Sequence, residues 1–252
     1  MIEIKDLYFG YNRDSKKEHY VLNGLNLKIK SGEFVSIMGS NGSGKSTLAL
    51  CVKGILKPSS GSIYVDGIDI TNDKFSGQIK DNIGIVFQNP DNQFISTSVE
   101  REIAFGLENL GMSKDEMQKR ISEQIERFLI GKIRRNSPET LSGGEKQKIA
   151  IAAVLISNPK YLIIDEATSY LDPAERKNIT NLLKSEFFLK RNDWFTTIFI
   201  TQYPYEALIS RRLIIMDKGK IVIDGKPNEV FRNVKELKKI GIRVPVEFEI
   251  FY

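Results

Sequence analysis

The stretch Gly39–Thr47, GSNGSGKST, has residue types and a spacing suited to holding a polyphosphate. It matches the pattern G-x-x-x-x-G-K-[ST], in which glycines let successive backbone N–H groups turn towards phosphate oxygens. We expect Lys45 to reach the β- and γ-phosphates of a nucleotide and the Ser46 hydroxyl to ligate Mg²⁺. The residues expected to contact the nucleotide here are Gly39, Ser40, Asn41, Gly42, Ser43, Gly44, Lys45, Ser46 and Thr47.

Two adjacent carboxylates, Asp165 and Glu166, follow the apolar run Tyr161–Ile164. At the carboxyl end of a buried strand, Asp165 could reach the Mg²⁺ held by Ser46, directly or through water. Glu166 would then polarise the water that attacks the γ-phosphate, as a general base. Surface charge is the alternative reading, and the phosphate loop upstream disfavours it.

The segments around these residues alternate between strand and helix patterns. The apolar run 34–38 leads into the phosphate loop, and 47–52 continues as a helix. Residues 63–65 and 68–70, around Asp66-Gly67, predict a hairpin. A short strand at 83–87 delivers Gln88 to a loop rich in turn formers. A further strand at 196–201 and a hairpin at 213–223, which turns at Lys218-Gly219, complete an α/β pattern.

Residues 97–130 have helical periodicity instead, which predicts a helical segment inserted between strands. Capping boxes are expected at Thr97–Glu100 and Ser113–Glu116. The stretch LSGGEKQ (Leu141–Gln147) opens an apolar helix that runs to about Ile156, and Pro173 begins another helix. The tail from Asn228 reads as two short helices and a loose end.

The composition is that of an ordinary globular protein, with 252 residues, 41% apolar and 27% charged. No apolar run approaches the ~20 residues of a membrane-spanning helix. A single cysteine, Cys51, excludes an intramolecular disulfide, fits a reducing cytosol and is expected to be buried. The net charge of +5 permits contact with nucleic acid or an anionic membrane, but the basic residues are scattered.

LSGGEKQ, taken with the phosphate loop, Gln88, Asp165-Glu166 and SYLD (Ser169–Asp172), resembles the nucleotide-binding subunits of ABC transporters over residues 2–225. The resemblance implies a P-loop NTPase with a RecA-like core, an antiparallel β-subdomain and an inserted helical signature subdomain. We therefore expect an ATPase domain at 1–227, with the helical subdomain at about 92–158, and a short C-terminal extension at 228–252. It also implies head-to-tail dimers that sandwich two ATP molecules.

Site roles carried over by the resemblance fall on both sides of such a dimer. Spacing alone favours a packed surface tyrosine at Tyr11, whereas the resemblance makes it the aromatic that stacks on adenine. Gln88 becomes a Mg²⁺ and water sensor, and Asp172 couples the two sites. The N-terminus of the signature helix would contact the γ-phosphate bound by the partner subunit, through Ser142, Gly143, Gly144 and Glu145. The expected metal ligands are Ser46, Gln88 and Asp165, and the expected catalytic residues are Glu166, Gln88 and Gln202.

Gln202 departs from the family pattern, which places a histidine in T-H-D-x-x-E-A where this chain has TQYPYEA (Thr201–Ala207). The chain's single histidine, His19, precedes the phosphate loop. Glutamine keeps a hydrogen-bond donor but cannot become cationic. Loss of one preorganised transition-state contact typically costs ~2.7–4 kcal/mol, so hydrolysis at this site is expected to be about 10²–10³-fold slower. A heterodimer with a paralogous ATPase is favoured over a homodimer.

Three strings narrow the resemblance to ATPase subunits of energy-coupling factor importers, which take up vitamins or transition-metal ions: FQNPDNQF, AFGLENLGM and GKPNEVF. The resemblance implies peripheral association at the cytoplasmic face of the cell membrane. The implied partners are a second ATPase subunit, an integral membrane transporter subunit and a substrate-binding membrane component, without nucleic acid. Acidic side chains expected to meet the membrane partner are Asp91, Glu100, Glu102 and Glu108.

Alternative functions stay open at this point. They are an ATPase of another ABC transporter class, a DNA-associated or translation-type ABC ATPase, and a regulatory subunit that binds ATP with little turnover. A DNA-associated ATPase of this type carries a long coiled coil before the signature, but here about a hundred residues without heptads intervene. Translation-type proteins normally carry two such domains in one chain. Glu166 and the intact signature disfavour the regulatory alternative.

Overall fold

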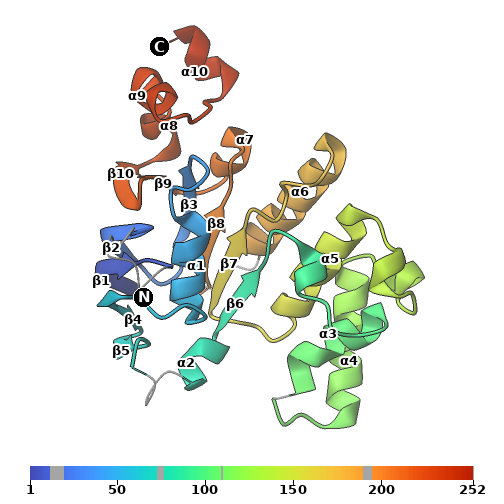
Figure 1. Ribbon diagram of the computed structural model, residues 1–252. Helices are drawn as coiled ribbons and strands as arrows, with labels where there is room; N and C mark the ends of the chain where they lie inside the picture. Colours follow the sequence, from blue (N-terminus) through green and yellow to red (C-terminus); the bar gives the residue numbers. More distant parts are fainter. Residues whose placement is uncertain (12–19, 73–76, 109, 190–194, 252) are drawn as a thin grey trace. The chain divides into compact units, whose positions relative to one another are not determined.

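The computed structural model describes residues 1–11, 20–72, 77–108, 110–189 and 195–251. The chain forms two compact units, which are described separately. Unit 1 comprises Met1–Ile83, Lys160–Asp165 and Asn192–Tyr252. Unit 2 comprises Gly84–Pro159 and Glu166–Arg191. Strands and helices are mixed along the chain, as the sequence predicted (Figure 1).

Unit 1 contains an antiparallel four-stranded sheet in the order β2-β1-β4-β5. Its strands are β1 (Ile2–Phe9), β2 (Leu22–Ile29), β4 (Ser60–Val65) and β5 (Ile68–Asp69). Alternate side chains of β1 and β2 are buried, as expected for strands with one face on the core. The predicted hairpin is confirmed, because Val65 pairs with Ile68 across Asp66-Gly67.

Asp66, at the tip of that hairpin, supplies a prediction about stability. Burial alone would raise the pKa of its carboxyl group, but hydrogen bonds from Lys160, the terminal amine and Tyr161 outweigh burial and lower it to about 2. Because the folded pKa lies below the unfolded value of about 3.9, the ionised carboxylate stabilises the fold above pH ~4. That stability is lost as the pH falls from about 4 towards 2.

Asp66→Asn is therefore expected to lower the free energy of unfolding at neutral pH, by roughly 1 kcal/mol after solvent screening of the partly exposed group. Urea unfolding measured at several pH values tests this expectation. The difference between variant and wild type should shrink as the pH falls below about 4. A difference that stays constant with pH would contradict the assignment.

The second sheet of unit 1 has the strand order β10-β9-β3-β8-β7. Its strands are β3 (Phe34–Gly39), β7 (Tyr161–Asp165), β8 (Thr196–Ile200), β9 (Arg212–Asp217) and β10 (Lys220–Gly225). β7, β8, β3 and β9 run parallel, and only β10 is antiparallel to its neighbour. β7 and β8 are buried at every residue, which explains the apolar runs Tyr161–Ile164 and Ile198–Ile200 within them.

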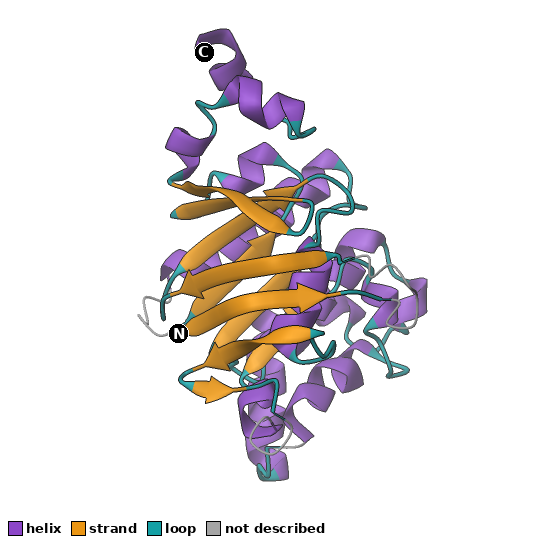
Figure 2. Cartoon of the chain, turned by 60° about the vertical axis from the view of Figure 1, so that its left-hand side comes forward, coloured by secondary structure: helices purple, strands orange, loops and turns teal. Residues whose placement is uncertain are grey.

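The helices of unit 1 are mostly short. They are α1 (Lys45–Lys53), α2 (Gly77–Asp81), α7 (Pro204–Ala207), α8 (Pro227–Val230), α9 (Val234–Lys239) and α10 (Val246–Phe251). Cys51 on α1 is buried as predicted, and burial raises the pKa of its thiol to about 12. Figure 2 shows the C-terminal helices grouped beyond one end of the strands of this unit.

The expectation that the chain finishes in a loose end is wrong. Ile242 and Val244, between α9 and α10, are buried in a cluster with Met38 of β3 and Leu213 and Ile215 of β9. Phe248 of α10 packs against the same cluster. The segment after Asn228 is thus attached to the edge of the parallel sheet by apolar burial.

Unit 2 is mainly helical. Its elements are β6 (Ile83–Val86, whose first residue belongs to unit 1), η1 (Pro90–Asn92), α3 (Val99–Glu108), α4 (Lys114–Arg127), η2 (Gly131–Ile133), η3 (Pro138–Thr140), α5 (Gly143–Leu155) and α6 (Pro173–Leu189). Its core includes Ile103 and Leu107 on α3 and Ile121 and Ile125 on α4, in agreement with the helical periodicity expected for 97–130. No helix in the described ranges is long and apolar enough to cross a membrane.

Of the two expected capping boxes, the one at Ser113–Glu116 is present in its N-cap half. The Ser113 hydroxyl accepts a hydrogen bond from the Glu116 amide and caps α4. The box at Thr97–Glu100 is out of register, because α3 begins only at Val99. The first amides of α3, those of Val99 and Glu100, instead donate to backbone carbonyls of the 134–136 segment.

Candidate nucleotide-binding site

The phosphate loop lies at the carboxyl edge of the parallel sheet of unit 1. The register pairs Ile200 with Ile37 of β3 and with Asp165 of β7, so these strands end at one level. Gly39 ends β3, and Gln202 comes two residues after the end of β8. Ligands in open α/β sheets bind at such a carboxyl edge. The sheet therefore brings together the loop, Asp165 and Gln202, which lie far apart in sequence.

The loop needs glycine at both of its ends. A Cβ atom on Gly39 would lie 2.4 Å from the Met216 carbonyl oxygen and from the Ser43 hydroxyl oxygen. Gly44 has a φ of +100°, and a Cβ there would lie 2.9 Å from the Val21 carbonyl oxygen. These close contacts, and the left-handed φ of Gly44, explain why glycine stands at both positions. A loop with this backbone can surround phosphate oxygens with its N–H groups.

Lys45 and Ser46 begin α1 and face the loop and β7. The Lys45 side chain is buried, and its ammonium donates to the carbonyl oxygens of Gly39 (3.0 Å) and Ser40 (3.1 Å). The Ser46 hydroxyl donates to Oδ1 of Asp165 at 3.0 Å. A hydroxyl and a carboxylate in contact beside a phosphate loop suit Mg²⁺, which takes one or two protein oxygens together with nucleotide phosphates.

Tyr11 lies beside the far end of the loop. Its hydroxyl is 3.1 Å from the Thr47 hydroxyl, and its ring packs edge-on against Phe9 with centroids 4.9 Å apart. The side chain is still 61% exposed. An aromatic ring held at its hydroxyl end and open on its face is suited to stacking on a nucleobase. His19 lies outside the described residues.

Glu166 and Gln88 belong to unit 2, where they contact each other. The Gln88 amide nitrogen donates to Oε2 of Glu166 at 3.4 Å, and the Ser169 hydroxyl donates to the same oxygen at 3.3 Å. Glu166 is 9% exposed and has a φ of +48°. A non-glycine residue with left-handed φ is strained, and such strain concentrates at functional sites.

The signature segment forms the expected helix N-terminus on α5. Ser142 and Glu145 cap it reciprocally, each side chain bonding the other's backbone amide. A Cβ on Gly144 would lie 2.5 Å from the Glu175 carboxylate, so the backbone there is closely approached. Asp172 caps α6, since its Oδ1 accepts from the amides of Ala174 (2.8 Å) and Glu175 (2.9 Å).

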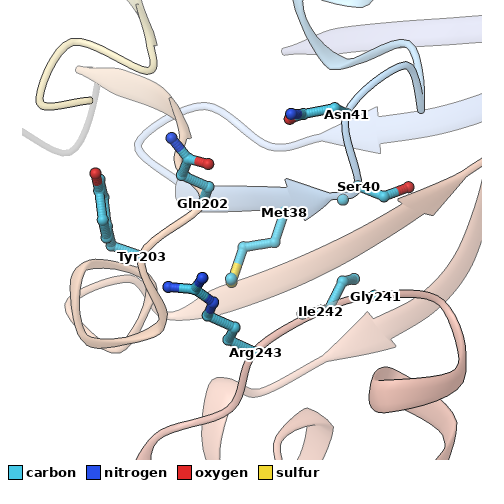
Figure 3. Close-up of a pocket in the computed structure, with 9 residues that line it drawn as sticks. Met38, Ser40, Asn41, Gln202, Tyr203, Gly241, Ile242 and Arg243 are labelled. Atoms are coloured by element: carbon cyan, nitrogen blue, oxygen red, sulfur yellow. The ribbon is translucent and has the colours of Figure 1, made fainter. Parts of the chain in front are cut away.

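A pocket of about 450 Å³ lies in unit 1 next to the start of the phosphate loop. Gly39, Ser40 and Asn41 form one side and Gln202 another, while Gly241, Ile242 and Arg243 come from the C-terminal segment (Figure 3). The sequence motifs did not predict the contribution of the C-terminal segment to this pocket. The alternating apolar residues Ile240, Ile242 and Val244 are compatible with burial, but they do not indicate what the segment packs against.

Comparison with known proteins places these motifs in context. Residues 22–169 match the family described as ABC transporter. The energy-coupling factor transporter ATP-binding protein EcfA1 of Clostridium novyi is 44% identical over 252 residues, which cover 100% of this chain and 89% of that protein. EcfA1 of Ligilactobacillus salivarius is 46% identical over 97% of this chain and 84% of its own length.

Solved structures agree with this relationship. The structure of cbiO1 from Clostridium perfringens, part of the ABC transporter complex cbiONQ, has a TM-score of 0.81 and 34% identity. It covers 99% of this chain and 98% of that chain. A dimeric ATP-binding cassette in a post-hydrolysis state, bound to ADP and phosphate, has a TM-score of 0.79 and 31% identity over 90% of this chain and 99% of that chain.

Proposed function

This chain belongs to the ABC transporter family, and we propose that it is the ATP-binding and ATP-hydrolysing subunit that powers an energy-coupling factor importer. The observation that carries the proposal is the arrangement of Lys45, Ser46 and Asp165 at the carboxyl edge of the parallel sheet. Relatives named as energy-coupling factor ATP-binding proteins, similar over the whole chain, support the transporter class.

Within this function, each motif residue has a proposed task. The phosphate loop, with Lys45, binds the nucleotide, and Tyr11 stacks on its base. Ser46, Asp165 and Gln88 are the proposed Mg²⁺ ligands, and the metal would neutralise charge on the phosphates. Glu166 accepts a proton from the attacking water. The signature residues Ser142, Gly143, Gly144 and Glu145 complete the site of a partner subunit, and Asp172 couples the two sites.

Co-purification and ATP hydrolysis test the function together. The tagged chain, expressed with the membrane proteins encoded beside it, should recover an integral membrane subunit, and the complex should release phosphate from ATP. A complex without ATPase activity would contradict the enzymatic role. Salt-sensitive binding to DNA, with no membrane partner, would support the DNA-associated alternative instead.

We further propose that this chain works in a heterodimer with a paralogous ATPase subunit. Gln202 lies in the pocket beside the phosphate loop, where a histidine could carry positive charge against the terminal phosphate. A neutral amide cannot, so turnover at this chain's own site should be slow. A paralogue with a complete site would then supply the faster turnover.

Gln202→His is expected to raise phosphate release by the purified chain about 10²–10³-fold. The measurement is steady-state ATP hydrolysis by the chain alone and after mixing with a co-purified paralogue. Tyr205→His, on a half-exposed side chain three residues along the same segment, controls for an added imidazole. Brisk hydrolysis by the wild-type chain alone, with no gain from Gln202→His, would overturn the heterodimer proposal.

We propose that the membrane partner docks on unit 2, at the loop after β6 and at α3, from the cytoplasmic face. Fewer acidic side chains are available for this contact than the sequence suggested. Glu102 is buried, and its carboxylate accepts from the amides of Ile95 and Ser96, so the expectation that it faces a partner is wrong. Glu100 is paired with Arg134, and Asp91 is paired with Lys146 at 2.7 Å. The exposed Glu108 is the better candidate for contact with a basic partner.

A further inference from the structure

The charge in the pocket beside the phosphate loop comes from the C-terminal segment. Of the nine described residues that line it, Arg243 carries a charge and none is acidic. The Arg243 side chain is exposed and makes no ion pair or hydrogen bond with another described residue. Figure 3 shows it extending from the C-terminal segment towards the turn that carries Gln202 and Tyr203.

The backbone at Arg243 is held in place rather than free to move away. Its two neighbours, Ile242 and Val244, are 5% and 6% exposed and belong to the cluster that includes Met38 of β3. Met38 immediately precedes the phosphate loop and also lines the pocket. Apolar burial on both sides of Arg243 thus fixes its backbone beside the start of the loop, while its side chain is exposed.

A nucleotide bound at the phosphate loop is expected to point its terminal phosphate towards this pocket. Tyr11, the proposed base-stacking residue, contacts Thr47 at the helical end of the loop. Lys45 is the first residue of α1, and in such motifs this lysine reaches the β- and γ-phosphates. The residues at the opposite end of the loop, Ser40 and Asn41, line the pocket. A nucleotide with its base at Tyr11 therefore directs its phosphate tail towards Ser40 and Asn41.

We propose that Arg243 binds the terminal phosphate of the ATP held by this chain's own phosphate loop. The proposal rests on the ATP-binding function given above. A guanidinium presents a planar fork of donors that matches phosphate oxygens, and it stays charged at all physiological pH values. The pocket also has room for a phosphate group together with ordered water. Arg243 would favour ATP over ADP in the ground state, whereas Gln202 slows the chemical step.

Binding of ADP and of the non-hydrolysable analogue AMP-PNP by the full-length chain tests the proposal. Arg243→Ala is expected to weaken AMP-PNP binding about ten- to hundredfold, the range for loss of one hydrogen bond to a charged group, and to leave ADP binding unchanged. Arg243→Lys should recover part of the loss. Lys239→Ala, which removes an exposed cation from α9 in the same segment, should change neither affinity.

The possible results of these binding measurements distinguish the role of Arg243 from the ATP-binding function on which it rests. Failure of the wild-type chain to bind either nucleotide would overturn the ATP-binding function itself. Unchanged AMP-PNP affinity in Arg243→Ala, or an equal loss for both nucleotides, would overturn only the role of Arg243. Arg243→Ala could instead weaken assembly with another ATPase subunit and leave the ratio of AMP-PNP to ADP affinity unchanged. That result would make Arg243 an interface residue and would also overturn its role in phosphate binding.

Discussion

Lys45→Ala is expected to weaken ATP binding about ten- to hundredfold and to reduce hydrolysis at this chain's own site to near background. Lys45 is 5% exposed, and its ammonium donates hydrogen bonds to the carbonyl oxygens of Gly39 and Ser40. A hydrogen bond to a charged group is worth about 1.5–3 kcal/mol, and every 1.4 kcal/mol is a tenfold change in affinity. Titration with a fluorescent ATP analogue measures the first effect, and phosphate release measures the second.

Lys57→Ala is the matched control, because this exposed lysine follows α1 by a few residues and does not belong to the loop. Its nucleotide affinity should equal that of the wild type. The thermal unfolding midpoint of each variant shows whether the fold is preserved. Wild-type affinity for ATP in a folded Lys45→Ala variant would contradict the assignment of the loop.

The phosphate loop could be predicted from sequence because its function depends on neighbours in the chain. The strand, the glycines and the helix are consecutive, so a short string contains the strand, the loop and the first turn of α1. Asp165 was predictable for a related reason. A buried parallel strand has an uninterrupted apolar sequence, and a carboxylate at its end lies at the edge where the other parallel strands also end.

The C-terminal segment could not be predicted because its structure depends on distant contacts. Ile242 and Val244 are buried only because they reach Met38, about two hundred residues earlier in the chain, and Leu213 of β9. Gly241, with a φ of +76°, makes the turn after α9 that allows this approach. Local periodicity over so few residues cannot reveal a partner of this kind, so the segment read as loose.

The acidic residues of unit 2 show the same limit. Glu102 follows a polar pattern typical of a surface helix, yet it is buried because the amides of Ile95 and Ser96 need an acceptor. The first turn of α3 is likewise satisfied by carbonyls from residues 134 and 136 rather than by Thr97. Both the burial of Glu102 and the capping of α3 therefore depend on backbone groups that only the fold brings together.

Glu166→Gln is expected to lower ATP hydrolysis about 10²–10⁴-fold, the contribution of a positioned general base, with little change in ATP affinity. The amide has nearly the same size and can still accept the hydrogen bonds from Gln88 and Ser169, but it cannot take a proton from water. The left-handed backbone at this position should be equally strained in both proteins, because neither side chain is glycine. Phosphate release under single-turnover conditions measures the chemical step directly.

Glu139→Gln on η3, which removes an exposed carboxylate shortly before the signature, is the control for loss of one negative charge. It should leave both binding and hydrolysis unchanged. Comparison with Lys45→Ala gives the sharper test, because the two variants should separate the steps. Lys45→Ala should bind ATP more weakly, whereas Glu166→Gln should keep its affinity for ATP and hydrolyse it more slowly. If Glu166→Gln hydrolysed ATP at the wild-type rate, proton transfer would have to be assigned to another group, and the strained backbone at position 166 would then need a structural explanation.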